Sequence, residues 1–574
     1  MPISASIGIG EGLVRRGVVK QAAKRVVRQV RRRVLPKAPI SDWESLLKKD
    51  RDSWEKYREA SRDGPQVLIA TSTGGHRAVV PLESLLAVAL TLRGARVHIL
   101  LCDEVLPACL QATSIEYRKQ ATFVRDGPKS LCRDCFRPGY ATFQPLGLPV
   151  LRYSEWIKTE DRARASALSQ LTPANEIAEF RLDGLKIGEH ALAGALRYFA
   201  KGDLGDEPLG EAVLRRYFHA SLLTAFGLES LFEALDFNTA CFHHGIYVPQ
   251  GIIGEVARNM GVRVVNWNPA YRKKCFIFSH NDTYHHTLLS EETDIWESVP
   301  WTTVLESKVM DYLKSRWEGT QDWIWFHERP EEDLRKIVRE LGLDMSKPTI
   351  GLLTNVLWDA QLHYPSNAFP GMLDWLIQTI KHFSSRPEIQ LVIRVHPAEV
   401  RGWLPSRQPV VEEIRKVFPK LPENIYVIPP QSRISTYAVM LQCDSVIIYG
   451  TKTGVELTSL GLPVIVAGEA WIRNKGLTLD ARTPEEYLEL LDRLPLGKKL
   501  DDATTRRARK YAYHFFFRRM IPLASMQPVP GWPPYQVKIS GIENLLPGRD
   551  PGLDVICEGI LHGTEFVLRD ELQP

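Results

Sequence analysis

The sequence predicts an α/β protein with two doubly wound parallel-sheet domains that face a cleft, preceded by a basic helical arm. Two separate series of short apolar strands alternate with helices, and strand–helix–strand units of this kind form parallel sheets. The first series covers roughly residues 64–300 and the second begins at residue 349. No stretch of about 18 residues is apolar and free of charge, so the sequence predicts no transmembrane helix.

The first series begins with VLIATSTGGH (67–76), which is typical of a buried strand that runs into a glycine turn. A helix over 81–93 and a strand ARVHILLCDE (95–104) complete a strand–helix–strand unit. Further along, TACFHHG (239–245) is again a strand with a glycine turn, followed by a helix and by the strand VRVVNWN (262–268). These units indicate a Rossmann-like sheet.

The second series shows five apolar strands separated by helices. The strands are expected at 349–356, 389–397, 424–430, 444–450 and 463–468, and the helices at 370–384, 409–417, 432–442, 453–461 and 484–493. A last helix over 502–520 is expected to cross back to the first domain. The predicted organisation is an arm (1–40), a helical linker (41–63), a first domain (64–345), a second domain (346–500) and a C-terminal helix with a tail (501–574).

The basic arm carries most of the charge asymmetry of the chain. Residues 1–37 hold ten Lys and Arg and one acid, Glu11, within a chain whose formal net charge is +5. The remaining body is therefore mildly acidic, which argues against a nucleic-acid binder. Valines and alanines fill one half of a helical wheel and basic residues most of the other, a pattern suited to an anionic membrane surface. A solvated tail and a mitochondrial transit peptide are the alternatives.

Two histidine-bearing turns follow strands of the first domain. The turn after the first strand contains Gly74, Gly75 and His76, and small residues there let the backbone approach a ligand or a phosphate. The turn after a later strand contains His243 and His244, and imidazoles of ordinary pKa are natural proton acceptors. Either turn alone is equally compatible with a tight connection or a structural histidine. Further candidates for acceptor contact, which a helical core with surface charges explains equally well, are Ile187-Gly188-Glu189-His190 and Arg197-Tyr198.

The second domain carries polar residues at the carboxyl ends of its strands, where open α/β sheets bind ligands. Thr451, Lys452 and Thr453 open a helix with Glu456 one turn in, followed by Gly461-Leu462-Pro463. A phosphate at the helix start and a ribose diol at the carboxylate would fit this arrangement. The other candidate donor-site residues, each with a capping or solvated-loop alternative, are His396 before Pro397, Ser435 and Arg473.

Taken together, the glycine–histidine turn and the Thr-Gly-x-Glu-x4-Gly-x-Pro element resemble those of GT-B glycosyltransferases. The first turn is similar to that of the lipid-linked muramyl-peptide N-acetylglucosaminyltransferase, although Pro81 lies two residues further on. The His396-Pro397 pair and the helix near Ser435 resemble capsule-polysaccharide biosynthesis proteins, which include CMP-sugar-dependent transferases. The resemblance implies that His396 and Ser435 hold donor phosphates and that Glu456 meets the ribose.

On this basis we expect a glycosyltransferase that moves a sugar from a CMP-, UDP- or GDP-linked donor to a surface polysaccharide or glycolipid acceptor. His244, His76 or His243 would take the acceptor proton, with inversion at the sugar. Transfer would need no metal, because helix N-termini, His396, Lys452 and Arg473 would neutralise the phosphates. The protein would work on the cytoplasmic face of the plasma membrane. A polyol-phosphate transferase, a nucleotide-sugar epimerase and a non-catalytic assembly or export protein are the alternatives.

The eight cysteines include four within 34 residues of the first domain. Cys132 and Cys135 form a C-x2-C pair, with Cys109 and Cys102 upstream. This spacing predicts a structural zinc ion on Cys109, Cys132 and Cys135, with free thiols in a reducing compartment as the alternative.

Overall fold

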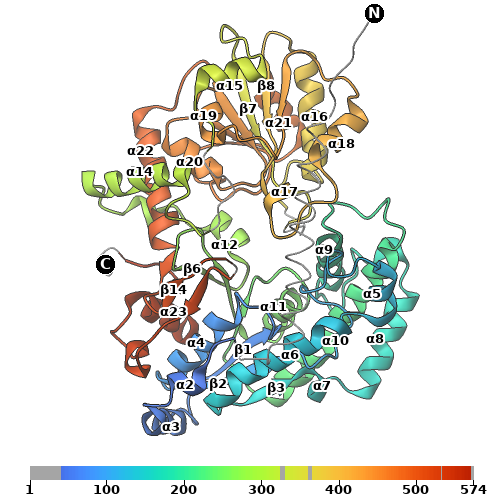
Figure 1. Ribbon diagram of the computed structural model, residues 1–574, viewed down its shortest axis with the longest axis vertical. Coiled ribbons are helices and arrows are strands. Elements are labelled where there is room, and N and C mark those ends of the chain that lie inside the picture. Colours follow the sequence, from blue (N-terminus) through green and yellow to red (C-terminus); the bar gives the residue numbers. More distant parts are fainter. Residues whose placement is uncertain (1–39, 324–329, 360–364, 532, 570–574) are drawn as a thin grey trace, which may run out of the picture.

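The computed structural model describes residues 40–323, 330–359, 365–531 and 533–569. The predicted amphipathic arm (1–37) lies outside these residues. The described chain forms two α/β halves, one carrying a sheet from the N-terminal part of the sequence and the other a sheet from residues 349–480 (Figure 1). No helix in the described ranges is long and apolar enough to cross a lipid bilayer.

The first sheet has seven strands in the order β13-β6-β5-β4-β1-β2-β3. From β5 to β3 all neighbours pair in parallel, whereas β6 and β13 are antiparallel additions at one edge. The order 3-2-1-4-5 of the parallel strands is that of a Rossmann sheet. The strands are β1 (Gln66–Ser72), β2 (Arg96–Leu101), β3 (Val150–Arg152), β4 (Thr239–His243), β5 (Arg263–Pro269), β6 (Cys275–His280) and β13 (Ile521–Pro522).

Helices cover both faces of this sheet because its strands are apolar on both faces. Alternate residues of β1 enter different cores: Val67 and Ile69 pack on one side, and Leu68 and Ala70 on the other. The first core includes α4 (Val80–Thr91) and α23 (Pro551–His562). The second includes α9 (Ile187–Phe199), α10 (Gly210–Ala234) and α11 (Gln250–Asn259).

The second sheet has six parallel strands in the order β12-β11-β10-β7-β8-β9, again the Rossmann order. The strands are β7 (Thr349–Leu353), β8 (Gln390–Arg394), β9 (Ile425–Ile428), β10 (Ser445–Ile448), β11 (Val464–Val466) and β12 (Leu479–Asp480). One face packs against α16 (Met372–Ser384), α18 (Val410–Val417) and α21 (Pro484–Asp492), and the other against α19 (Thr436–Met440) and α20 (Thr453–Ser459). The predicted fold class, two Rossmann-like domains, is confirmed.

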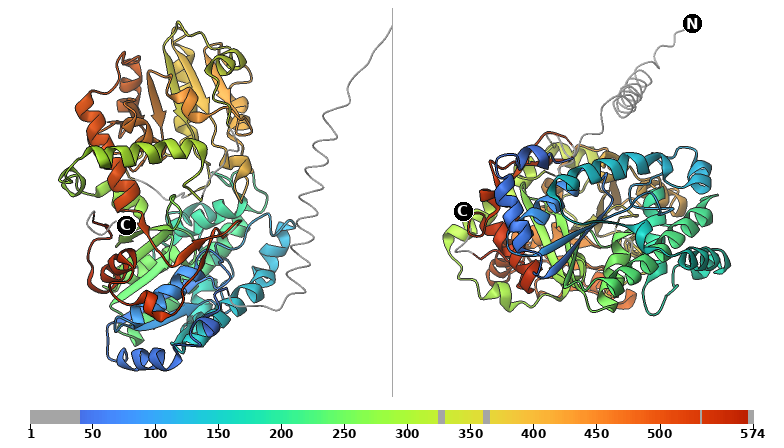
Figure 2. Two further views of the ribbon diagram at one scale, coloured as in Figure 1. Left: turned by 60° about the vertical axis from the view of Figure 1, so that its left-hand side comes forward. Right: turned by 90° about the horizontal axis from the view of Figure 1, so that it is seen from below.

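The C-terminal segment joins the two halves (Figure 2). Helix α22 (Asp502–Tyr513) packs against α20 and against α14 (Thr303–Glu318). The chain then adds β13 to the edge of the first sheet, and α23 packs on α4. Helix α15 (Leu334–Leu341) contacts α19 of the second sheet. The N-terminal helices α2 (Trp43–Leu46) and α3 (Arg51–Ala60) lie against the first half, where the indole N–H of Trp54 donates to the carbonyl of Leu146.

Candidate active site

Both sheets reverse their strand order between two central strands, and loops leave these strands on opposite sides of the sheet. In Rossmann sheets this switch point, at the carboxyl ends of the strands, is where ligands bind. The switch points lie between β1 and β4 in the first sheet and between β7 and β10 in the second. The Tyr247 hydroxyl, after β4, donates a 3.0 Å hydrogen bond to the carboxylate of Asp359, after β7. The two switch points therefore face each other.

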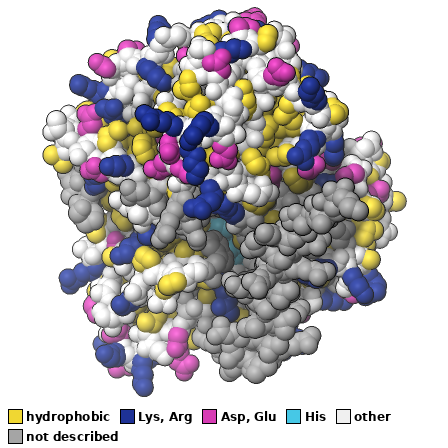
Figure 3. All heavy atoms as spheres, turned by 45° about the horizontal axis from the view of Figure 1, so that its top comes forward, with side chains coloured by type: hydrophobic (Ala, Val, Ile, Leu, Met, Phe, Trp, Pro, Cys, Tyr) yellow, Lys and Arg dark blue, Asp and Glu magenta, His cyan; other side chains and the backbone are white. Residues whose placement is uncertain are grey.

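Three histidines meet at the switch point of the first sheet. The His76 and His243 rings are 5.3 Å apart between centroids, and the His243 and His244 rings are 5.4 Å apart. The histidine turns predicted from the sequence therefore form one cluster. His243 is only 7% exposed and packs on Trp267, whereas His76 and His244 are half-buried. Figure 3 shows histidine surface in a hollow beside a group of Lys and Arg side chains.

The backbone at this cluster adopts an uncommon conformation. Ser72, at the end of β1, and His244, directly after β4, both have positive φ angles, of 53° and 69°. Such angles are costly for residues other than glycine and concentrate at functional sites. The Nδ1 atoms of His243 and His244 are buried without a hydrogen-bond partner. The cluster thus presents polar atoms that the described protein groups leave unsatisfied.

The histidine cluster is electrically neutral around pH 7. Burial, together with the charge of Arg197, lowers the pKa of His76 to about 4. Burial, then His285 and Arg197, lowers the pKa of His244 to about 3, and burial also lowers the pKa of His243 well below its usual value. Neutral imidazoles can accept a proton, but such low pKa values make them weak bases until negative charge arrives nearby.

Arg197 is the cation of this cluster. Its guanidinium lies 5.0 Å from the ring centroid of Tyr247 and 4.9 Å from that of Trp403. Trp403 belongs to the second half, follows His396-Pro397 in the chain, and is 63% exposed. A mostly buried arginine held between two aromatic rings is fixed in position at little cost in side-chain entropy. Arg197 is therefore a preorganised positive charge between the two halves.

Glu83 lies beneath the histidines and was not predicted from the sequence. Its carboxyl accepts a 3.0 Å hydrogen bond from the Trp267 indole, and it is completely buried. Burial raises the pKa of Glu83 to about 8, against the opposing effect of its hydrogen bond with Trp267. An acidic residue in the otherwise apolar helical run 79–90 was the available signal.

The two glycines of the first turn pack against a helix. A Cβ on Gly74 would lie 3.0 Å from the Cα of Gly139, and one on Gly75 would lie 2.7 Å from the Cα of Cys135. Both contacts are with α6 (Lys129–Phe143). The absence of side chains at Gly74 and Gly75 is thus explained by helix packing. The expected role of these glycines as a phosphate loop stays a prediction beside this packing role.

Glu456 is engaged within the protein. It is 1% exposed, and its carboxylate pairs with Lys452 at 2.7 Å and with Arg316 at 3.1 Å, while the Tyr437 hydroxyl also donates to it. Burial would raise the pKa of Glu456, but the charges of Arg316 and Lys452 outweigh it and lower the pKa to about 2. In the structure three protein groups therefore contact the Glu456 carboxylate, and the expected ribose contact stays a prediction.

Arg473 is likewise a structural residue. Its side chain is 0% exposed, and its guanidinium donates to the carbonyls of Gly468 and Ala481. It therefore holds the loop after β11, and the expected contact with a donor diphosphate is corrected. Ser435 is the N-cap of α19, where its hydroxyl accepts a 3.3 Å hydrogen bond from the Ala438 N–H. This is the capping role that the sequence offered as the alternative to donor binding.

The remaining donor-site candidates lie at the switch point of the second sheet. His396 follows β8 half-buried, its backbone N–H donates to Thr354, and its Nδ1 accepts from the N–H of Ala398. Thr451 and Thr453 are half-buried at the start of α20, where their hydroxyls are 3.3 Å apart. The Lys452 ammonium lies 4.7 Å from the ring centroid of Tyr271 in the first half.

Two residues that the sequence did not single out also lie at the site, His285 at the contact between the halves and Asn355 at the second switch point. His285, whose charge would act on His244, lies 5.5 Å between ring centroids from Trp471 of the second half. The side-chain amide of Asn355, after β7, donates to the carbonyl of Gly450 and so spans the second switch point. Neither residue sits in a recognisable motif, so only the fold brings them to the site.

The predicted zinc ligands meet at a pocket but not as a ligand set for one ion. Cys102, Cys109, Cys132 and Cys135 all line the pocket behind the first histidine turn. Across the part of the chain that the structure describes, no group of three or more His, Cys, Asp or Glu side chains is arranged to hold a metal ion. Cys109, Cys132 and Cys135 therefore do not form a ready zinc site.

Comparisons with known proteins add little to this geometry. No family model matches the chain, and no curated protein matches it. Solved structures similar to it include the KpsC β-Kdo 2,4-transferase of Thermosulfurimonas dismutans, at 12% identity over 48% of this chain and 79% of that one, with a TM-score of 0.32. The Neisseria meningitidis UDP-GlcNAc 2-epimerase bound to UDP-GlcNAc is 11% identical over 78% of this chain and 98% of that one, with a TM-score of 0.26.

The Streptomyces sp. SF2575 glycosyltransferase SsfS6 is 12% identical over 78% of this chain and 94% of its own, with a TM-score of 0.22. All of these similarities are too weak to assign an activity. The strand order of the two sheets defines the fold without them, and the geometry of the site has to support any function.

Proposed function

We propose that this protein is a GT-B-type glycosyltransferase that moves a sugar from a nucleotide-sugar donor to a hydroxyl of a surface polysaccharide or glycolipid. The observation that carries the proposal is the cluster of neutral imidazoles and one preorganised arginine at the switch point of the first sheet. This cluster faces the polar switch point of the second sheet. An acceptor hydroxyl needs a proton acceptor, which the imidazoles offer, and a leaving nucleotide needs positive charge, which Arg197 offers.

In the proposed reaction the acceptor oxygen attacks the anomeric carbon of the donor sugar. The bond from that carbon to the phosphate oxygen breaks, the nucleotide leaves with the electron pair, and the hydroxyl proton passes to an imidazole. His76 and His244 are better placed for this than His243, which is nearly enclosed. Attack from the face opposite the leaving group inverts the anomeric carbon.

The charges around the cluster suit a reaction that begins only when the donor is bound. Burial lowers the pKa values of His76 and His244, and the positive charge of Arg197 lowers them further. A donor phosphate near Arg197 would offset this positive charge, raise the imidazole pKa values and so strengthen the base. His396, Thr451, Lys452 and Thr453 are the proposed donor-binding residues, without Arg473 and Glu456, and no metal ion takes part.

The test is a panel of CMP-, UDP- and GDP-linked sugars incubated with the full-length protein and crude polysaccharide or glycolipid acceptors. Release of free nucleotide that depends on acceptor is the expected result, and it identifies the donor. Interconversion of the donor sugar without an acceptor would indicate a nucleotide-sugar epimerase instead. Transfer of a polyol phosphate would indicate a polyol-phosphate transferase.

Variants of the cluster connect the activity to the site. We expect H76A or H244A to lower kcat by about 100-fold or more, the usual contribution of a general base. R197M should lower kcat/KM. H562A is the matched control, because His562 is exposed on α23. Nucleotide release that stays at the wild-type level in both H76A and H244A contradicts the proposed site.

We also propose that residues 1–37 bring the protein to an anionic membrane surface on the cytoplasmic side, where lipid-linked acceptors are found. The support is the amphipathic, strongly basic sequence of this segment, in which each basic residue near such a surface adds about 1 kcal/mol. Deleting residues 1–37 should abolish sedimentation of the protein with phosphatidylglycerol-containing vesicles. Its sedimentation with neutral vesicles should not change. Unchanged sedimentation of the truncated protein would refute this role.

A further inference from the structure

Glu83 directs the polar group of helix α4 towards the site. Every residue of α4 (Val80–Thr91) is buried, and its other polar side chains, Ser84 and Thr91, donate their hydroxyls back to carbonyls of the same helix. The Glu83 carboxyl instead accepts a 3.0 Å hydrogen bond from the indole of Trp267 on β5. The helix therefore makes one buried polar contact with a strand that leads to the histidine cluster.

The Trp267 ring carries this contact to the histidines. The Trp267 and His243 rings are 5.0 Å apart between centroids, and the His243 ring lies 5.3 Å from the His76 ring and 5.4 Å from the His244 ring. His243 is nearly enclosed by its neighbours. Because rings in a close-packed interior cannot shift one at a time, the orientation of the Trp267 indole limits the positions of the histidines.

The backbone joins Glu83 to His76 by a second path. The His76 carbonyl accepts hydrogen bonds from the N–H groups of Val79 (2.9 Å) and Val80 (3.1 Å), and the Val79 carbonyl accepts one from the Glu83 N–H (3.1 Å). The helix that carries Glu83 thus starts from the turn that carries His76. Together with the side-chain contacts through Trp267, this backbone path closes a ring, and each member of a closed ring has less conformational freedom than in an open chain.

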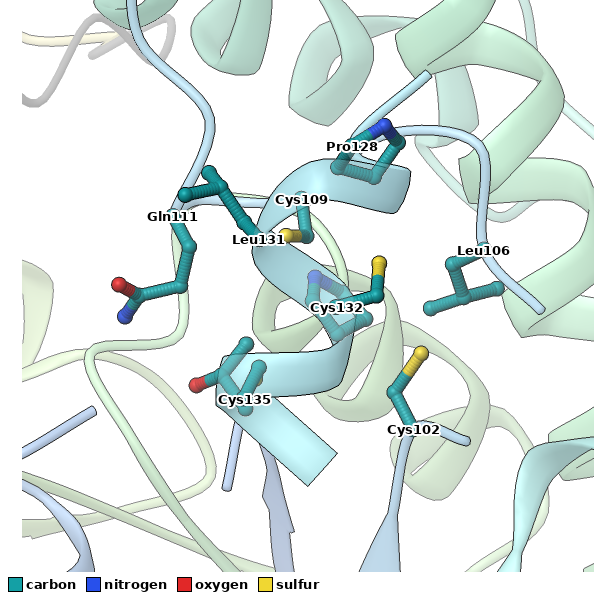
Figure 4. A pocket seen from close by; sticks show the side chains of 10 residues that line it. Cys102, Leu106, Cys109, Gln111, Pro128, Leu131, Cys132 and Cys135 are labelled. Atoms are coloured by element: carbon teal, nitrogen blue, oxygen red, sulfur yellow. The ribbon is translucent and has the colours of Figure 1, made fainter. Parts of the chain in front are cut away.

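Helix α6 holds the same turn at another point. The Gly75 N–H donates to the sulfur of Cys135 at 3.2 Å, and Cys135 belongs to the part of α6 that lines a small pocket (Figure 4). The first turn is therefore fixed at Gly75 by α6 and at His76 by α4. His243 follows a different strand, and the contact from Glu83 through the indole ties it to the same frame.

The pair of Glu83 and Trp267 orients the site more than it stabilises the protein. The indole satisfies one oxygen of Glu83, whereas the other, Oε2, is buried and has no hydrogen-bond partner among the described residues. A buried polar atom without a partner costs free energy, so two apolar side chains of the same shape would fill this space at least as well. A hydrogen bond has a direction, which apolar contact lacks, and it fixes how the indole lies against His243.

We propose that Glu83 is a positioning residue, which acts through Trp267 to set where the three histidines of the cluster meet the acceptor hydroxyl. This role rests on the proposed function, in which one of these histidines takes the proton. Glu83 is completely buried, so it acts through the intervening side chains and not by touching the substrate. A displacement of about 1 Å at a catalytic group can lower turnover by about 100-fold, so the orientation of one indole is enough to matter.

Variants that remove one partner or both separate positioning from stability. E83L leaves the indole without an acceptor, W267F leaves the carboxyl without a donor, and E83L/W267F removes both polar groups. We expect each single variant to melt at a lower temperature than the wild type and the double variant to recover most of this loss. Turnover should not recover. In all three variants kcat should stay at least about tenfold below the wild type, with the KM for the donor within about twofold.

E83Q is the conservative rescue, because its amide oxygen can accept from the Trp267 indole. S84A is the matched control, since Ser84 is a buried polar neighbour whose hydroxyl bonds within α4. Both should keep kcat within about twofold of the wild type, measured as acceptor-dependent nucleotide release well below the melting temperature. A double variant that regains wild-type kcat together with its stability overturns the proposal, and so does an E83Q variant as slow as E83L.

Histidine titration tests the role without any sugar transfer. In nuclear magnetic resonance of histidine-labelled protein, E83L and E83L/W267F should shift the titrations of His76 and His244 by about 1 pH unit towards ordinary imidazole values, because a loosened cluster admits water. E83Q should titrate like the wild type. Unchanged titrations in both E83L and the double variant overturn the positioning role even if the protein transfers sugar. A wild-type protein that releases no nucleotide while these titrations shift contradicts the proposed function and supports the link between Glu83 and the histidines.

Discussion

The hydroxyl of Tyr247 donates a 3.0 Å hydrogen bond to the carboxylate of Asp359, and this bond ties the central loop of one Rossmann sheet to the central loop of the other. Tyr247 also carries Arg197 over its ring. The position of the arginine charge relative to the histidines is therefore coupled to the contact between the two halves of the protein.

Removing this hydroxyl should loosen the contact between the two halves. We expect Y247F to cost about 1 kcal/mol in the free energy of unfolding, the usual value of one hydrogen bond, and to speed amide exchange in residues 244–249 and 354–359. Hydrogen–deuterium exchange with mass spectrometry measures the second effect. Y426F is the control, since the Tyr426 hydroxyl contacts Gly342 away from the switch points. Equal exchange in both variants would show that the Tyr247 bond does not join the loops.

Glu456 should behave as a structural anion. E456Q removes the negative charge that Lys452 and the buried Arg316 share, leaving Arg316 only Asp322, and removing one partner of a buried ion pair typically costs about 3–5 kcal/mol. Because the pKa of Glu456 is about 2 in the folded protein, its stabilisation is present above its unfolded pKa and is lost as the pH falls from about 4.5 towards 2. Urea unfolding as a function of pH should show this slope in the wild type and not in E456Q.

The exposed E485Q substitution on α21 serves as control for the Glu456 measurement. The opposite result, a stability of E456Q equal to that of the wild type, would point to the ribose role predicted from the sequence. In that case E456Q would unfold like the wild type, and only its affinity for a nucleotide would fall.

Glu83 should make the free energy of unfolding depend on pH in the opposite direction to Glu456. Its folded pKa of about 8 means that the folded protein keeps a proton which the unfolded chain releases at about pH 4.5. Its stabilising contribution is therefore complete below about pH 4.5 and is lost as the pH rises through 8. E83Q keeps an acceptor for the Trp267 indole and lacks the titration, so its stability relative to the wild type should increase over this range.

The E83L substitution tests the hydrogen bond separately from the charge. It leaves the Trp267 N–H unsatisfied in a buried place, which should cost about 1–3 kcal/mol relative to E83Q at every pH. If the wild type and E83Q show the same dependence of unfolding free energy on pH between 5 and 9, Glu83 does not titrate there.

Nucleotide binding should change the titration of the histidines. In the free protein His76 and His244 should titrate near pH 4 and pH 3, below the range of an ordinary imidazole. An anionic donor phosphate close to Arg197 should raise both pKa values by about 1–3 pH units, and R197M should raise them without a nucleotide. Nuclear magnetic resonance of histidine-labelled protein follows both effects, with exposed His562 as the internal reference. Unaltered His76 and His244 titrations with saturating nucleotide would place the donor elsewhere.

Gly75 should tolerate no side chain. A Cβ at this position would lie 2.7 Å from the Cα of Cys135, and since a backbone atom cannot move aside cheaply, G75A should cost about 1–3 kcal/mol. It should also shift the His76 turn and reduce turnover. G205A, where the nearest atom is the end of the Asp203 side chain at 3.5 Å, is the matched control in thermal unfolding. Similar melting temperatures for the two variants would argue against the tight contact with α6.

Much of the architecture followed from local patterns in the sequence. Apolar runs such as 67–72 and 445–448 and the helices between them predicted two parallel sheets, because strands buried on both faces need apolar residues on both faces. The position of His76, His243 and His396 directly after such runs also placed them at the carboxyl ends of strands. Parallel sheets bring all these ends to one edge, so the meeting of His76 with His243 and His244 was predictable.

Tertiary structure alone decided which polar side chains face the site. Glu456 and Arg473 occupy motif positions, yet Arg316, 140 residues before Glu456, and the carbonyls of Gly468 and Ala481 turn them into structural groups. Glu83 and Asp359 reach the histidines and Tyr247 only through the packing of sheet and helix. Sequence spacing sets the place of a residue along a strand or helix. The direction and partners of its side chain depend on chain segments that are distant in sequence, and these meet only in the folded protein.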